Sequence, residues 1–458
     1  MKFSKITIPV LAVTIGFTAC KKIEITPDGT VETSQAITRE SDVKDVLNAA
    51  YSPLAGGSFY GGRLQKVSEY LADQANGASV TGYDGDIVNY RSSPNGGTFD
   101  VYKEPYYIIQ RANKVLENIG LVTSSTAAKD NYSGQAKFLR AVGHFELVRL
   151  FAQPYGYTSG NTQPGIVIRT ISEQELGRAR NTVDEVYTTV LNDLRDAQNL
   201  LPATNGIYPT KWAAKGYLAK VFFQMNKFDS AWKYANEVIT GSTAVFDNDS
   251  NFVTKRFNNP VSSEAIFYLV NDPNNVRFGG LRNDGATAIG LALPITSATY
   301  NAGIANSKDF RRKWYTNTAG IYGINKYKAN PFVLPVLHIT EMKLIRAESA
   351  AELNTNLATA IADINDITNR AYNATLPPLL AGASAATIKN RVRNERKLEM
   401  IYETGDRLQE IKRIGAKGEP SVSHGGAVWN CNGMVLQFPA SEFNVNANFI
   451  PNLTGGCL

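Results

Sequence analysis

The sequence predicts an all-α protein in which helical hairpins of the tetratricopeptide type form a superhelical frame, decorated by long irregular loops and a few short strands. Three observations predict this class. Apolar residues recur at intervals of three and four over much of the chain, which is the periodicity of an amphipathic helix. One helix start carries a capping box. Two helical pairs place small and aromatic residues at the offsets of tetratricopeptide repeats, and repeated hairpins favour a superhelix.

The first 19 residues have the pattern of a secretory signal peptide. Lys2 and Lys5 precede an uncharged run over residues 6–19, which is too short to span a bilayer. Small residues before Cys20 resemble a bacterial lipobox, so Cys20 is the expected lipidation site and mature N-terminus. The alternative is an ordinary cleaved signal with an incidental cysteine. Several acyl chains on Cys20 would anchor the protein in a membrane.

After the signal peptide we expect a lipid anchor and tether over residues 20–40 and one helical domain over residues 41–458. The domain divides into an N-terminal part, 41–250, and a C-terminal part, 251–458. The first helix starts near Ser41. Its apolar face comprises Val43, Val46, Leu47 and Ala50.

Residues 56–99 are rich in Gly, Tyr, Asn and Ser, and only the run 64–75 has a helical pattern. A long irregular insertion in a compact domain is more often functional than idle. Similar composition predicts loops with short strands over 247–334, with strand-like runs at 265–270 and 288–293, and an irregular C-terminus from residue 415.

Helices dominate the remainder. Apolar residues repeat at helical spacing over 102–119 and 138–148, and Thr182 with Glu185 forms a capping box that starts a helix ending before Pro202. The first hairpin spans 219–238, with Asn226 and Lys227 as its turn. A weaker copy of the hairpin spans 344–370.

Composition excludes some functions. The net charge of +6 is spread along the chain without a Lys/Arg tract, so nucleic acid is not an expected ligand. The 22 Tyr residues suit a polar ligand such as sugar or peptide. The three His residues have no metal-site spacing, and Asp84 and Asp86 could ligate Ca²⁺ but fit a turn better. We therefore expect no metal and no cofactor.

Enzyme activity is not expected, because the chain has no nucleophile elbow, no phosphate loop and no dinucleotide fingerprint. The sequence does not exclude a catalytic pair of carboxylates that come from distant parts of the chain. A secreted α-helical glycoside hydrolase anchored at the cell envelope is therefore the alternative function. Release of product from candidate glycans would favour the hydrolase.

Residues 394–415, the signature segment, combine dense charge with a thin apolar line. The pattern predicts one charged helix, a glycine break and a second short helix. Arg391 and Glu395 stand four apart and Arg396 and Glu399 three apart, so opposite charges can pair on one helix face. From the residues alone the segment is a solvated helix laced with ion pairs.

The Glu-Arg-x-x-Glu of the signature segment, followed by a small residue, an acid, an arginine and Lys-Arg, resembles the C-terminal signature of the SusD/RagB family. Residues 140–155, 344–370 and 438–452 resemble further family segments in the family's order. Leu408 departs from the pattern, since an aromatic residue often stands there. The resemblance implies a surface-exposed, lipid-anchored outer-membrane protein. It would capture oligosaccharide or peptide and deliver it to a SusC-like TonB-dependent transporter.

Cys431 and Cys457 are the cysteines left after lipidation of Cys20, and the expected compartment permits oxidation. We therefore expect a disulfide between them. Two unpaired buried thiols are the alternative.

The ligand site is expected on a face where the loop 77–99 meets the tract 277–327. Aromatic faces with fixed polar donors hold sugar rings, and several aromatic residues here lack helical periodicity, so packing does not obviously claim them. The candidate ligand-binding residues are Tyr83, Tyr90, Arg91, Arg282, Trp314, Tyr315 and Tyr322, with Asn89 as a further donor. Trp429 is a competing candidate, but its closeness to Cys431 favours a packing role. Alanine at Trp314 or Tyr83 would weaken binding without lowering the melting temperature.

Overall fold

The computed structural model describes residues 37–173, 177–270, 278, 280–281, 293–328 and 332–457. Residues Arg39–Leu458 form one compact unit. The predicted signal peptide, the lipidation site Cys20, the candidate Arg282 and most of the expected strand 288–293 lie outside the described residues.

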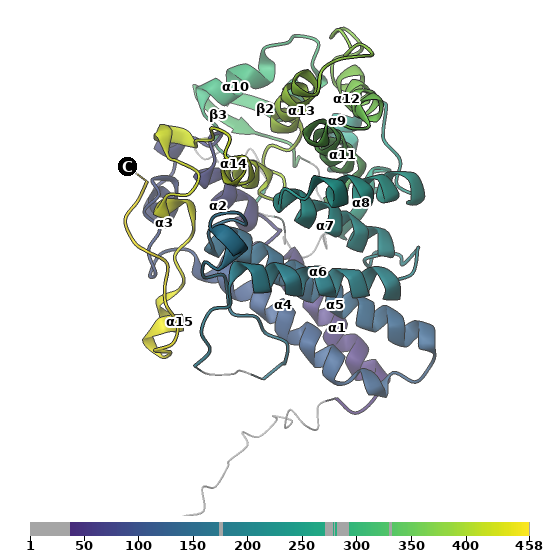
Figure 1. Ribbon diagram of the computed structural model, residues 1–458, viewed down its shortest axis with the longest axis vertical. Helices are drawn as coiled ribbons and strands as arrows, with labels where there is room; N and C mark the ends of the chain where they lie inside the picture. The colour runs from purple at the N-terminus through teal and green to yellow at the C-terminus, as the bar shows by residue number, and fades with distance from the viewer. Residues whose placement is uncertain are drawn as a thin grey trace, which may run out of the picture. The chain divides into compact units, whose positions relative to one another are not determined.

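The described chain is predominantly helical, and the expectation of a tetratricopeptide-like helical frame is confirmed. Successive helices pack in pairs, α4 on α5, α5 on α6, α6 on α7 and α7 on α8, after which α8 packs on α11 (Ile339–Leu353) (Figure 1). The N-terminal helices are α1 (Glu40–Ala55), α4 (Phe99–Glu117), α5 (Thr126–Phe151), α6 (Val183–Leu200), α7 (Lys211–Gln224) and α8 (Phe228–Gly241).

Local chemistry explains the helix boundaries. The Thr182 hydroxyl accepts the N–H of Glu185, whose carboxylate accepts the N–H of Thr182, which is the predicted capping box of α6. The turn between α7 and α8 holds Asn226 at a φ of 57°, a left-handed conformation that asparagine tolerates. The predicted hairpin is therefore present.

The C-terminal helices are α11 (Ile339–Leu353), α12 (Leu357–Ala371), α13 (Ala385–Glu399) and α14 (Asp406–Ala416). Helix α11 packs against α12 and α13, and small residues let the helices approach closely. Their shared core includes Leu344, Ala347, Ala350, Ala360, Ile364, Ile367, Ile388 and Val392. The predicted weaker hairpin, the glycine break at Gly405 and the second short helix are all present.

Two small antiparallel sheets interrupt the helices. Strand β1 (Ala265–Val270), which was expected, pairs with β4 (Val333–His338), which was not. Strand β2 (Tyr315–Thr318) forms a hairpin with β3 (Ile321–Ile324).

Short helices occupy the loop tracts. Residues 56–99 contain a second helix besides the expected one, so the prediction of a single helix there is wrong. The short α-helices are α2 (Arg63–Leu71), α3 (Gly82–Val88), α9 (Phe252–Lys255), α10 (Ser297–Ile304) and α15 (Ala440–Asn444). The 3-10 helices are η1 (Gly77–Ser79), η2 (Ile119–Leu121), η3 (Ser159–Asn161), η4 (Phe310–Trp314), η5 (His424–Gly426) and η6 (Asn432–Met434).

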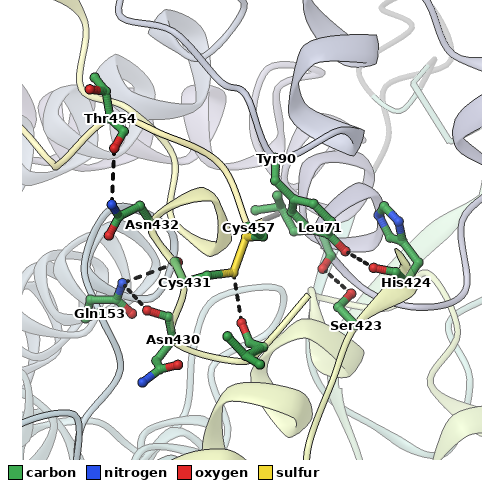
Figure 2. The surroundings of a disulfide bond; sticks show 11 residues. Leu71, Tyr90, Gln153, Ser423, His424, Asn430, Cys431, Asn432, Thr454 and Cys457 are labelled. Carbon is green, nitrogen blue, oxygen red and sulfur yellow. Dashed lines mark hydrogen bonds between the residues drawn. A yellow bond between two sulfur atoms is a disulfide. The ribbon is translucent and has the colours of Figure 1, made fainter. Parts of the chain in front are cut away.

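A disulfide joins Cys431 to Cys457, the pair expected from the sequence (Figure 2). The Asn432 side chain donates to the carbonyl of Thr454 at 3.1 Å, which links the same two segments of the chain. The last residues, which have little helix, are therefore held to the body of the domain. Among the described helices, none combines the length and apolar character needed to cross a bilayer.

Candidate ligand-binding site

The loop tracts on either side of the expected site lie next to each other. Ala75 forms an antiparallel bridge with Ile295, and the N–H of Thr296 donates to the carbonyl of Gln74 at 3.0 Å. On the other side, the N–H of Ile295 donates to the carbonyl of Tyr322 at 3.1 Å. Residues 293–296 therefore connect the loop before α3 to the β2–β3 hairpin.

The signature segment contacts both of these loop tracts. Most of its charged side chains are buried. Glu395, Glu399 and Glu403 are each at most 3% exposed, so the prediction of a solvated helix is wrong, although the helix is ion-paired as expected. Its ion pairs link distant parts of the chain. Arg396, expected to pair with Glu399 one turn away, instead donates to Asp406 at 2.8 Å.

Glu399 is the centre of a buried ion network. Its carboxylate oxygens lie 2.9 Å from Arg256, 3.3 Å from Arg370 and 3.3 Å from Arg311. Burial alone would raise the pKa of Glu399, but the three guanidinium groups outweigh it and hold that pKa well below its usual value. Arg370 belongs to α12, Arg256 directly follows α9, and Arg311 lies in η4. Glu399 therefore joins α13 to three separate parts of the chain.

Arg311 carries that network into the candidate site. It contacts Glu395 at 2.7 Å and Asp309 at 2.8 Å. It lies in η4, directly before β2. The conformation of the β2–β3 hairpin is therefore anchored on the signature segment.

The turn between α13 and α14 anchors the other loop. The backbone N–H of Tyr402 donates to Glu69 of α2 at 3.0 Å, and the Tyr402 hydroxyl donates to the carbonyl of Pro294 at 2.7 Å. Glu403 in the same turn lies 2.6 Å from Lys326 and 2.9 Å from His338. Burial opposes ionisation of Glu403, but Lys326 and His338 lower its pKa to about 2. One short turn therefore fixes both loop tracts.

Tyr83 is the most exposed of the predicted aromatic site residues, at 58%. It lies in the first turn of α3, over Gly97, where a Cβ atom would come within 2.8 Å of the Tyr83 Cβ. Arg63 donates to the Gly97 carbonyl at 2.8 Å and to Asp84 at 2.5 Å. These contacts fix the base of Tyr83 and leave its ring available to a ligand.

Tyr322 on β3 is half-buried and pairs with Tyr300 of α10, with ring centroids 4.7 Å apart. Sequence reasoning missed Tyr300, which is also half-buried. Its position in an Asn- and Gly-containing segment within the predicted tract was a signal that could have found it. The pair adds aromatic surface near the bridge that joins the two loops.

The expectation that packing does not claim the other aromatic residues is wrong. Tyr90 is 3% exposed, stacks on His424 at 4.5 Å and donates to the His424 carbonyl at 3.0 Å (Figure 2). Trp314 is 1% exposed and donates to the Val253 carbonyl at 2.8 Å. Tyr315 is 8% exposed and packs on Gly303. In this conformation these three rings support the loops.

The polar candidates have different positions. Arg91 is exposed, and the side-chain amide of the exposed Asn89 donates to the Gly85 carbonyl at 2.6 Å.

Trp429 packs against Gly415, where a Cβ would lie 2.0 Å from the indole, as the expected packing role requires. Asp84 is paired with Arg63, and no cluster of three potential metal ligands occurs among the residues that the structure describes.

The fold and the loop face define a class: a tetratricopeptide-like helical protein that holds aromatic loop residues on a rigid, internally charged frame. One family model, described as "Starch-binding associating with outer membrane", matches residues 23–223, and another, described as "SusD family", matches residues 296–448. These successive matches occupy most of the chain. The chain belongs to the SusD/RagB family.

Individual proteins resemble it over the whole or a part of its length. It is 24% identical to "SusD-like protein P2" of Formosa agariphila, over 99% of this chain and 100% of that protein. It is 27% identical to "SusD-like protein P25" of the same species, over 59% of this chain and 52% of that protein.

Solved structures share the fold. A putative sugar binding protein of Bacteroides vulgatus matches with a TM-score of 0.80 and 24% identity, over 91% of this chain and 99% of the other. A SusD superfamily protein of Bacteroides thetaiotaomicron matches with a TM-score of 0.78 and 19% identity, over 91% and 100%.

Proposed function

We propose that this protein is a non-catalytic, lipid-anchored protein of the outer-membrane surface. It captures oligosaccharide at the loop face around Tyr83 and delivers it to a partner TonB-dependent transporter. The observation that carries the proposal is a largely exposed tyrosine ring in the first turn of α3, with its base fixed by Arg63 and Gly97. The descriptions of the matching family model and of the sugar-binding structural relative support carbohydrate as the ligand.

The chemistry of the face suits a sugar. A flat aromatic face packs against the C–H groups of a pyranose ring, and a few fixed polar groups orient its hydroxyls. Tyr83 offers the face, and Arg91 and Asn89 are exposed polar groups a short distance along the same chain segment. Because the frame beneath is rigid, little conformational entropy is lost when the ligand binds. Peptide remains the second ligand class for the same face.

The direct test is a glycan and peptide array probed with the purified full-length protein, with each binding glycan also incubated for product release. Binding without cleavage is the expected result. Cleavage would favour the envelope-anchored glycoside hydrolase, and binding to peptides alone would exclude carbohydrate as the ligand.

Replacing Tyr83 with alanine is expected to weaken binding of an array-identified glycan by more than about 1 kcal/mol, because the exposed ring is lost from the contact surface. The melting temperature should stay that of the parent, since the ring contributes little to the core. Calorimetric titration and thermal unfolding measure the two effects. Tyr157→Ala, at a 39% exposed tyrosine whose ring packs edge-on against Trp429, is the matched control and should bind as the parent does. Parent-like affinity of the Tyr83 variant would place the site elsewhere.

Replacing Cys20 with alanine is expected to abolish lipid attachment, because the lipobox cysteine is the residue that carries the lipid. Cells expressing the parent or the variant are grown with a radioactive fatty acid, and the immunoprecipitated protein is counted. The parent should be labelled and the variant should not. Cys431→Ala serves as the matched cysteine control and should keep its label. Label retained by the Cys20 variant would refute the anchor.

A further inference from the structure

A groove runs along the flank of α4, and its position does not follow from the predicted site. Its volume is about 320 Å³, at the lower end of the range for small-molecule pockets. One wall is α4, another is the segment 169–173, and Glu442 of α15 also lines the groove. The lining residues are Phe99, Tyr102, Lys103, Tyr106, Tyr107, Gln110, Arg169, Ile171, Ser172, Glu173 and Glu442.

Two aromatic rings of the groove face solvent. Phe99 is 51% exposed and Tyr107 is 46% exposed, although both belong to a helix with a well-buried opposite face. Lys103, one turn from each, lies with its ammonium 4.9 Å from the centre of the Phe99 ring. The helical spacing of four therefore aligns two rings and a cation along the groove.

The floor of the groove is fixed by hydrogen bonds. The Tyr106 hydroxyl donates to the Val167 carbonyl at 2.9 Å, and the Arg169 guanidinium lies 5.5 Å from the Tyr106 ring centre. Gln110 donates to the Ser172 carbonyl at 3.4 Å. These contacts attach the second wall to α4.

Glu442 supplies a carboxyl group to the lining of the groove. Burial raises its pKa, while a hydrogen bond from Tyr102 and the charge of Arg169 act in the opposite direction. Lys103, Arg169 and Glu442 thus place donors and an acceptor around the aromatic faces. Such a mixture binds hydroxyl-rich ligands rather than purely apolar ones.

The disulfide-closed segment carries this carboxyl group. Residue 442 lies between Cys431 and Cys457, and the segment is also tied to the body of the domain by two asparagines. Asn446 donates to the Arg178 carbonyl and Asn448 to the Gly177 carbonyl, each at 2.8 Å. The segment that carries Glu442 is therefore held in place although α15 has only five residues.

A second hollow shares Phe99 with the groove. It has a volume of about 210 Å³ and is lined by Gly96, Gly97 and Phe99 together with residues of the 94–95 and 439–441 segments. Phe99 also lines the groove, and Tyr83 packs directly over Gly96 and Gly97. Phe99 therefore belongs to both hollows, and the second hollow reaches the two glycines on which Tyr83 packs.

We propose that the α4 groove is a second carbohydrate subsite, which binds the one or two sugar units at the far end of an oligosaccharide whose other end contacts Tyr83. This inference rests on the proposed function. It adds a length preference, because a ligand that reaches both Tyr83 and Tyr107 gains contacts that a disaccharide cannot make.

The test is calorimetric titration of the full-length protein with malto-, cello-, xylo-, laminari- and chito-oligosaccharides of two to eight units. In at least one series, affinity for the parent should rise about tenfold or more between two and eight units. Tyr107→Ala should weaken binding of the longest member about fivefold or more and remove most of the gain with length. Tyr107→Phe keeps the ring and should bind as the parent does, and Tyr157→Ala is the off-site control.

The outcomes separate this inference from the proposed function. Affinity that rises with length in Tyr107→Ala as in the parent overturns the groove subsite and leaves the Tyr83 site standing. Length-independent affinity in the parent overturns it as well. If no oligosaccharide binds the parent, both the groove subsite and carbohydrate capture fail. Melting temperatures of the Tyr107 variants should match the parent, which excludes unfolding as the cause of lost binding.

Discussion

Replacing Glu399 with alanine is expected to lower the free energy of unfolding by about 3–5 kcal/mol, the usual cost of removing one partner from a buried ion pair. Glu399 is 0% exposed and faces Arg256, Arg311 and Arg370, each also buried. Without the carboxylate, three guanidinium groups lose their shared counter-ion in a place that water does not reach. Urea unfolding with linear extrapolation measures the change.

A surface pair provides the control for this variant. Lys137 lies 2.6 Å from Asp196, with side chains 25% and 54% exposed. Lys137→Ala should therefore change the free energy of unfolding by only about 0–1 kcal/mol. A Glu399 variant no less stable than this control would show that the network does not support the fold.

The pH dependence of the parent follows from the same carboxylate. The pKa of Glu399 is lower in the folded protein than in the unfolded chain, so the folded state favours the ionised form. The stabilisation is fully present above the unfolded-state pKa and is lost as the pH falls towards the folded-state pKa. The same sign applies to Glu403, whose folded pKa is about 2.

The helical frame was predictable because its signals are local. Periodic apolar residues, the Thr182 capping box and the Asn226 turn each specify structure within a few residues, and the helices formed where these signals lie. The role of the signature segment was not predictable in this way. Its local spacing permits i to i+3 and i to i+4 pairs, whereas the fold pairs Arg396 with Asp406 and Glu399 with Arg256. Sequence spacing alone carries no information about such distant partners.

The candidate site was predictable as a region but not residue by residue. Glycine- and asparagine-rich composition marks a loop correctly, yet it does not tell whether an aromatic ring on that loop points outward, as Tyr83 does, or inward, as Trp314 does. Tyr90 and Tyr83 lie in the same loop tract, and Tyr90 is buried against His424. Phe99 and Tyr107 were overlooked for the opposite reason. They belong to a helix, where the apolar periodicity suggested core packing although their own rings are exposed.

Replacing Trp314 with alanine is expected to lower the free energy of unfolding by about 3–5 kcal/mol, as for other buried large-to-small aromatic changes. The burial of Trp314 reverses the sequence-based expectation of unchanged stability. Its indole packs edge-on against Phe252 with centroids 5.7 Å apart, and the Lys326 ammonium lies 4.2 Å from its centre. Alanine leaves a cavity beside the buried ion network and removes the donor to the Val253 carbonyl. Urea unfolding of the full-length variant measures the loss.

Trp314→Phe separates the two contributions to that loss. Phenylalanine keeps much of the ring volume but cannot donate to Val253, so its stability should lie between those of the parent and the alanine variant. Tyr83→Ala, at the exposed ring, should unfold at the parent's urea concentration. Under conditions where Trp314→Ala is still folded, we expect any loss of glycan affinity to come from displacement of the β2–β3 hairpin. A Trp314→Ala protein that is as stable as the parent but no longer binds glycan would instead show that the indole reaches the ligand directly.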